Sequence, residues 1–294
     1  YDKGRYPEWK SISTPFSFWL VSFFPYSDNG YEPLILRQEG IFYLIGLYVI
    51  ATVLILYFQL KTIMYSNKIL LIMLLTMPFL FTLERGNLLF ITLLFLLISS
   101  LNYKKLWIFS IFMAMAISLK IYLIALLFIP LLNLHFSRII LTLLLALFIN
   151  FISANILGES NWWLFISNIL EFSSDPRHYE WSYFTYSYQN ILLAFTELNP
   201  KYKDIGAWSH ILTLLTTFIF FLFVSIKYLL SSSSFRNEKR NTLFLLLIML
   251  IMIVVKNSGG YVFILLFPFL SSIIFNRISL YILLLLLLPI EIPF

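Results

Sequence analysis

The amino-acid sequence predicts an all-α fold, a polytopic transmembrane helical bundle with short or broken helices and a long outer loop. Hydrophobic residues make up 61% of the 294 residues and charged residues only 12%, which is typical of integral membrane proteins. The apolar runs have helical lengths, whereas the strands of a membrane barrel would be about 10 residues long and would alternate strictly. Several runs are also interrupted by charged residues, which are costly inside a bilayer.

The first part of the chain, residues 1–40, is predicted to form an outer loop. It is polar and aromatic, and its apolar stretch at 15–25 is too short to cross a membrane. We therefore expect an interfacial or partly inserted helix there. The sequence opens with Tyr1 in a polar segment, and we expect a membrane helix upstream of it.

Residues 41–294 are predicted to form the transmembrane bundle, with about ten crossings and an outer loop at 158–206. Single full spans are expected at 41–60, 139–157 and 207–230, and a polar, basic loop at 231–241. Shorter apolar arms lie at 69–83, 88–103, 106–119, 121–134, 243–255 and 261–275. Each arm would be roughly 20–24 Å long as a helix, against a hydrocarbon core of ~30 Å. Polar residues between two arms are therefore expected to lie below the membrane surface.

Three polar turns separate these short arms, at Glu-Arg-Gly-Asn 84–87, at Lys120 and at Lys-Asn-Ser-Gly-Gly 256–260. One straight helix over 106–134 would be roughly 43 Å long and would bury Lys120 near mid-membrane. We therefore expect two half-helices that meet at Lys120, a kind of break that is tolerated where it lines a cavity. The alternative is one tilted helix, kinked at Pro130, with a snorkelling lysine.

The loops alternate between two sides of the membrane, and basic residues mark one side as cytoplasmic. The short loops of this side carry half of the 20 Lys and Arg residues and one acid, Glu238. The three polar turns then share the opposite, outer side. Three cations near one leaflet favour a site for an anionic headgroup such as a lipid phosphate.

Other chemistries receive little support from the residues. The aromatic residues of 158–206 suit either sugar rings or an aromatic belt at the headgroups, and His178 among them is a candidate acid–base group. The chain has no cysteine and no metal-spaced histidines, so we expect no metal and no cofactor. No nucleotide-binding motif is present. The basic residues sit in short loops between membrane segments, so nucleic acid is not an expected partner.

The order of the motifs resembles glycosyltransferase family 87. Residues 82–87 read Thr-Leu-Glu-Arg-Gly-Asn, Tyr-Lys-Lys follows at 103–105, and 118–122 reads Ser-Leu-Lys-Ile-Tyr. In that family an Arg-Gly-Gln or Arg-Gly-Asn step precedes a Leu-Lys-x-Tyr-Pro step at similar spacing, although Leu123 replaces the proline here. Weaker similarity extends to Tyr6-Pro7, to 162–168, to 187–193 and to Tyr261 with Pro268.

The resemblance implies a C-type enzyme of the plasma membrane, with its active site on the periplasmic or exterior face. Such an enzyme transfers a hexose from a polyprenyl-phosphate donor to a lipid-linked or glycan acceptor, with inversion expected, among membrane lipids. The base would be Asp2 or an aspartate upstream of Tyr1. The donor phosphate would be bound by Arg85, Lys120 and Lys256. Supporting roles fall to Glu84, Asn87, Tyr122, His178 and Tyr261.

Two alternatives remain open at the level of sequence. An O-antigen polymerase or ligase also uses outer arginines and lipid pyrophosphates, but usually has an outer loop richer in Arg and His than 158–206. A lipid or sugar transporter predicts inverted repeats and access from both sides of the membrane. The repeats are not evident in this sequence.

Overall fold

The computed structural model describes four continuous stretches of the chain, residues 14–21, 88–157, 208–230 and 233–254. Shorter described pieces are 46, 49–50, 53, 79, 82, 163, 165–167, 195–196, 198–202, 262, 264–266 and 269. The regular structure in all of these is helical, which confirms the all-α prediction for the described residues. Two compact units are formed, one by Tyr1–Ile63, Phe81–Ile124 and His135–Asp175, the other by Met64–Leu80, Ala125–Leu134 and Pro176–Phe294.

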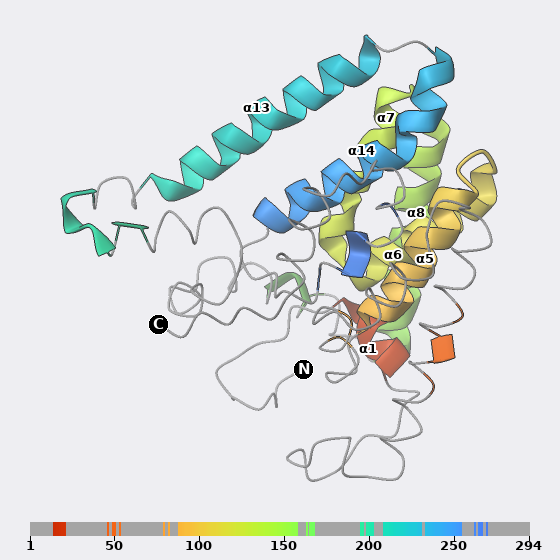
Figure 1. The fold of residues 1–294 in the computed structure, drawn as a ribbon. Helices are drawn as coiled ribbons and strands as arrows, with labels where there is room; N and C mark the ends of the chain where they lie inside the picture. The colour runs from red at the N-terminus through yellow and green to blue at the C-terminus, as the bar shows by residue number, and fades with distance from the viewer. Residues whose placement is uncertain are drawn as a thin grey trace. The chain divides into compact units, whose positions relative to one another are not determined.

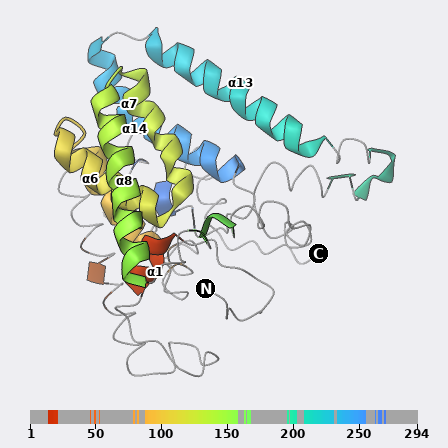
Figure 2. The same cartoon turned by 180° about the vertical axis from the view of Figure 1, so that it is seen from behind.

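The first unit is a small helical bundle arranged around α6 (Leu106–Leu119). The helices packed on α6 are α5 (Leu89–Leu101), α8 (Phe136–Leu157) and the short α1 (Pro15–Val21). Figures 1 and 2 show α5, α6 and α8 side by side, with α1 against one end of α6 and α8. The predicted helix at 106–119 is confirmed to the residue, and α1 lies within the predicted apolar stretch at 15–25.

Helices α6 and α8 meet along small and polar residues spaced four positions apart. These are Ser110, Ala114 and Ser118 on α6, with Thr142, Ala146 and Asn150 on α8, and all are buried. The Ser110 hydroxyl donates to the Arg138 carbonyl at 3.5 Å, and the Ser118 hydroxyl donates to the Ala146 carbonyl at 3.5 Å. Small side chains let two backbones approach closely, which is how helices associate where lipid offers no hydrophobic driving force.

The outer face of α8 is apolar and exposed. Its exposed side chains include Ile140, Leu144, Leu147, Phe148 and Phe151, each between 57% and 60% exposed. At 22 residues the helix is roughly 33 Å long, enough for a hydrocarbon core of ~30 Å. By length and composition, the segment Phe136–Ile156 can therefore cross a membrane.

The turn between α5 and α6, residues 102–105, is clamped onto the start of α8 by Arg138. The Arg138 Nε donates to the Tyr103 carbonyl at 3.0 Å, and its Nη2 donates to the Lys104 carbonyl at 3.2 Å. The guanidinium also lies over the Tyr103 ring, 5.0 Å from its centroid. The Tyr103 hydroxyl shares a 3.0 Å hydrogen bond with His135 Nδ1. We call residues 102–105 the clamped turn.

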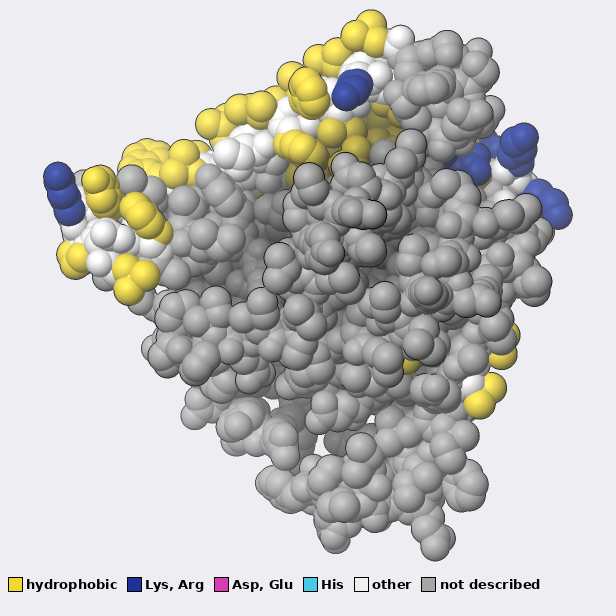
Figure 3. Space-filling model, in the orientation of Figure 1, with side chains coloured by type: hydrophobic (Ala, Val, Ile, Leu, Met, Phe, Trp, Pro, Cys, Tyr) yellow, Lys and Arg dark blue, Asp and Glu magenta, His cyan; other side chains and the backbone are white. Residues whose placement is uncertain are grey.

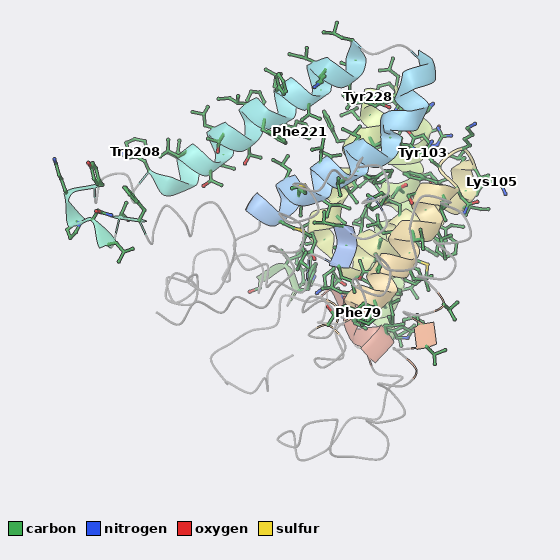
Figure 4. The ribbon with its side chains drawn as sticks, viewed as in Figure 1. Phe79, Tyr103, Lys105, Trp208, Phe221 and Tyr228 are labelled. Atoms are coloured by element: carbon green, nitrogen blue, oxygen red, sulfur yellow. The ribbon has the colours of Figure 1, made fainter. Side chains whose placement is uncertain are left out.

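The second unit contains α7 (Phe128–Leu132), η4 (Pro200–Tyr202), α13 (Ser209–Leu229) and α14 (Ser233–Val254). Helix α14 is buried along 243–252 except at Leu246 and Met249, and its Phe244 ring stacks on Phe269 with centroids 5.0 Å apart. On α13, the ring centroid of Phe221 lies 3.8 Å from that of Phe128. The Tyr228 hydroxyl donates to Asn133 Oδ1 at 3.0 Å. Figure 4 labels Phe221 and Tyr228 on this helix.

Helix α13 exposes apolar side chains at most of its positions, and Figure 3 shows them along the face turned to the viewer. Its buried positions are Thr213, Ser225 and Tyr228. With 21 residues it is roughly 31 Å long, and Ile211–Leu229 is the second segment that can cross a membrane.

The predicted loop at 231–241 is wrong, because α14 begins at Ser233. The charged residues Arg236, Glu238, Lys239 and Arg240 are good helix formers, so a polar composition did not require a loop. The arm predicted at 121–134 is also not one α-helix. It consists of a 3₁₀ helix, η2 (Ile121–Leu127), followed by the five-residue α-helix α7.

We predict that Ala146→Leu destabilises the first unit, because a larger side chain would force α6 and α8 apart. Overpacking of this kind costs roughly 1–3 kcal/mol. The thermal unfolding midpoint of the full chain in detergent micelles should fall by several degrees. The matched control is Ser137→Leu, a similar enlargement at an exposed position of α8. An unchanged midpoint for Ala146→Leu would contradict close packing of these helices.

Stability is also expected to fall in mild acid because of His135. Desolvation, and secondarily the positive charge of Arg138, lower the pKa of His135 below 6.5. Above pH 6.5 the imidazole is neutral in both the folded and unfolded chains, so it imposes no penalty. As the pH falls through 6.5 toward the lower folded-state pKa, the unfolded chain takes up the proton first and stability decreases.

The measurement is the thermal midpoint of the wild type and of His135→Gln at pH 7.5 and pH 5.5, in the same detergent. The variant should lose less stability on acidification, because the glutamine amide does not titrate. Equal losses in both proteins would show that His135 makes no contribution to the pH dependence.

Candidate functional site

The candidate site is the break between α6 and η2, where Lys120 lies. Lys120 has an extended backbone, with φ −137° and ψ 94°. Its N–H still donates to the Ala116 carbonyl at 3.0 Å, and its own carbonyl accepts from the Leu123 N–H at 3.0 Å. The predicted break at Lys120 is therefore confirmed. The 3₁₀ helix that follows has seven residues, longer than the usual 3–4, and such stretches often mark functional positions.

Two hydroxyl groups, one from Thr14 just before α1 and one from Ser17 within it, bind the end of α6. The last carbonyls of a helix have no partner within the helix, and leaving them unpaired in an apolar interior is costly. Here the Thr14 hydroxyl donates to the Ser118 carbonyl, and the Ser17 hydroxyl donates to the Leu119 carbonyl at 3.2 Å. Both carbonyls immediately before Lys120 are thus paired with a helix that lies about a hundred residues earlier in the chain.

Thr14 is also the N-cap residue of α1. Its Oγ1 accepts a hydrogen bond from the Ser17 N–H at 3.2 Å, the arrangement of a helix N-cap. Pro15 follows at the first helical position, where its missing N–H would have had no helical partner. The sequence Thr-Pro-Phe-Ser therefore both starts α1 and directs its hydroxyls at the end of α6.

Asn150 joins α8 to the same cluster. Its Nδ2 donates to Ser118 Oγ at 2.9 Å and to the Ala146 carbonyl at 2.9 Å. Its Oδ1 accepts from the Phe16 N–H at 3.4 Å. The asparagine is 9% exposed, so the amide is buried with its polar atoms paired, and a satisfied network of this kind rigidifies its surroundings. Hydrogen bonds thus join helices α1, α6 and α8 at Ser118, two residues before Lys120.

Lys120 itself is partly buried. Across the described residues, its ammonium group forms no hydrogen bond and no ion pair. The hydroxyl of Tyr122, two residues later, is buried. A cation on a fixed backbone, with its charge uncommitted, can bind an anion such as a phosphate group.

The other residues predicted for the site lie outside the described residues. These are Asp2, Glu84, Arg85, Asn87, His178, Lys256 and Tyr261. Within the described part of the chain, no group of three or more His, Cys, Asp or Glu residues could hold a metal ion.

Sequence reasoning missed Thr14, Ser17 and Asn150. Two patterns in the sequence mark these residues as polar or helix-starting positions. Thr-Pro at the start of an apolar stretch is a helix-start pattern, and Asn150 is a polar amide in the middle of an apolar run. Neither pattern names the partner, because the partners lie far away along the chain.

No family model, curated protein or solved structure matches this chain. Any assignment of function therefore depends on the geometry around Lys120 and on the resemblance of its motifs.

We predict that removing the α1 hydroxyls loosens the break. Thr14→Val leaves the Ser118 carbonyl unpaired and also removes the N-cap, and a buried unpaired group costs roughly 1–3 kcal/mol. Amide hydrogen exchange at 120–123 should become faster in Thr14→Val and in Ser17→Ala. Thr14→Ser, which keeps the hydroxyl, should exchange like the wild type. Unchanged protection in Thr14→Val would show that α1 does not hold the end of α6.

Proposed function

We propose that this chain is a polytopic integral membrane glycosyltransferase of the C type. It transfers a hexose from a polyprenyl-phosphate carrier to a lipid-linked or glycan acceptor at the outer face of the plasma membrane. The observation that carries the proposal is Lys120, a cation with no ion-pair partner among the described residues, at a break between two apolar helical segments. Its sequence, Ser-Leu-Lys-Ile-Tyr at 118–122, is also one of the motifs that carry the resemblance to family 87.

The length of α6 supports a site below the membrane surface. At 14 residues the helix is roughly 21 Å long, about 9 Å less than the hydrocarbon core. If α6 starts at one interface, Lys120 lies inside the opposite leaflet. A lysine at that depth costs ~2.5–3.5 kcal/mol or more when it is alone. A bound lipid phosphate would offset that cost, because opposite charges attract strongly where water is excluded.

In the proposed reaction, a carboxylate of the outer loop removes the proton from the acceptor hydroxyl. Asp2 is the candidate within this chain. The acceptor oxygen then attacks the anomeric carbon of the donor sugar, and the bond from that carbon to the phosphate oxygen breaks with inversion. The polyprenyl phosphate leaves with the electron pair of that bond. Lys120, with Arg85, stabilises the negative charge that grows on the phosphate.

The hydrogen bonds of Thr14, Ser17 and Asn150 suit the proposed role of Lys120, because they fix the backbone next to it. A catalytic cation must be held close to its productive position, and groups on rigid elements are held more closely than groups on loops. The lysine side chain is long and flexible, so a fixed backbone at its base removes part of its freedom in advance. An enzyme that stabilises a leaving phosphate would gain from this arrangement.

We predict that Lys120→Ala lowers sugar transfer at least about a hundredfold, the usual effect of removing one electrostatic stabiliser of the transition state. The assay measures transfer of radiolabelled sugar from polyprenyl phosphate in membranes. Lys120→Arg should retain part of the activity, because it keeps the charge. Lys201→Ala is the control, since Lys201 is an exposed lysine of η4. Near-normal transfer by Lys120→Ala would end the proposal.

A second measurement separates an enzyme from a transporter. The chain has no cysteine, so Lys120→Cys introduces a unique thiol. With a membrane-impermeant thiol reagent, the proposal expects labelling from the outer side alone. Labelling from both sides would instead indicate alternating access.

A further inference from the structure

The clamped turn at the other end of α6 presents a concentrated positive charge. Lys104 and Lys105 are exposed, and Arg138 lies directly beside them through its hydrogen bond to the Lys104 carbonyl. Within the described residues of the first unit there is no Asp or Glu to neutralise these charges. Figure 4 labels Lys105 at the edge of the unit, and Figure 3 shows Lys and Arg side chains gathered there.

The backbone that carries the two lysines is fixed. The Asn102 side chain donates to the Ile98 carbonyl at 2.9 Å, and the Lys105 N–H donates to the Asn102 carbonyl at 2.8 Å. Tyr103 is 5% exposed, with its ring edge against Phe109 at 5.1 Å between centroids. Binding to such a turn loses less conformational entropy than binding to a flexible loop.

Exposed apolar side chains follow the turn on α6 and lie near Arg138 on α8. Trp107, two residues after Lys105, is 62% exposed, and Phe136 at the start of α8 is 53% exposed. The exposed apolar face of α8 begins one turn later, at Ile140. Exposed aromatic residues between cations and an apolar helix face are typical of the boundary between lipid headgroups and acyl chains.

We propose that the clamped turn is a binding site for anionic phospholipid headgroups, in which Lys104 and Lys105 contact the lipid phosphate. Trp107 and Phe136 lie at the level of the glycerol backbone, and the acyl chains run along the exposed face of α8. Arg138 contributes charge, and its two bonds to backbone carbonyls hold the lysines in place. This site does not depend on the proposed glycosyltransferase activity, and it lies at the opposite end of α6 from Lys120.

The test is native mass spectrometry of the full chain in a neutral detergent, titrated separately with phosphatidylglycerol and with phosphatidylcholine. The wild type should bind phosphatidylglycerol more tightly. The double variant Lys104→Gln/Lys105→Gln should weaken phosphatidylglycerol binding about thirtyfold, the loss expected for two basic residues near an anionic lipid. Its phosphatidylcholine binding should stay unchanged.

The control is Lys201→Gln/Lys227→Gln, which removes two exposed lysines from the second unit. It should bind both lipids like the wild type. Equal weakening in the two double variants would overturn the site, because net charge alone would then explain the effect. Thermal midpoints of all variants should agree, so that a loss of folding is not read as a loss of binding.

Two further arms test the geometry and the source of the phosphate. Arg138→Lys keeps the charge but loses the paired bonds to the Tyr103 and Lys104 carbonyls, and it should weaken phosphatidylglycerol binding severalfold. Full binding by this variant would overturn the role of the clamp. Millimolar glycerol 1-phosphate should not displace the lipid. Displacement would indicate a site for soluble phosphates and would overturn the lipid assignment.

Discussion

The first unit depends on one constraint, that the last carbonyls of α6 need hydrogen-bond partners in an apolar interior. A helix that continues supplies these partners from its own next turn, but α6 stops at Leu119. Thr14 and Ser17 supply them instead. The helix ends there although no glycine or proline interrupts it. Hydroxyl donors from the neighbouring α1 segment lower the free-energy cost of the break, because they pair the last carbonyl groups of α6.

The same hydrogen bonds explain why three helices converge at this point. A hydroxyl can reach the Ser118 and Leu119 carbonyls only if α1 lies against the end of α6. Asn150 adds the third helix, because its amide is bonded both to Ser118 Oγ and to the Phe16 N–H. Farther along, small residues such as Ala114 and Ala146 allow α6 and α8 to stay in contact. Packing and hydrogen bonding therefore agree where the three helices meet, at Ser118 and Asn150, which is the consistency expected of a unique fold.

The two ends of α6 are different chemical environments. At one end, Arg138 holds a turn whose lysines are exposed, with several cations close together. At the other end Lys120 is partly buried and follows a network of neutral hydroxyl and amide groups. Exposed cations suit a surface of many anionic headgroups, whereas a single sheltered cation suits one bound anion. We therefore interpret the first end as a membrane-surface contact and the second as a ligand site.

The apolar run lengths were sufficient to predict that the described residues are helical and to place α6 at 106–119, because the length of an apolar run is a local property of the sequence. The break at Lys120 was also predictable, since a charge in the middle of a long apolar run is costly wherever it lies. The loop expected at 231–241 failed for the converse reason, because polar residues with good helix propensity can extend a helix as readily as end it. The partners of Lys120 required the tertiary structure. Thr14, Ser17 and Asn150 lie tens of residues to more than a hundred residues from the carbonyl or hydroxyl groups they bind, and no local pattern determines which distant groups meet.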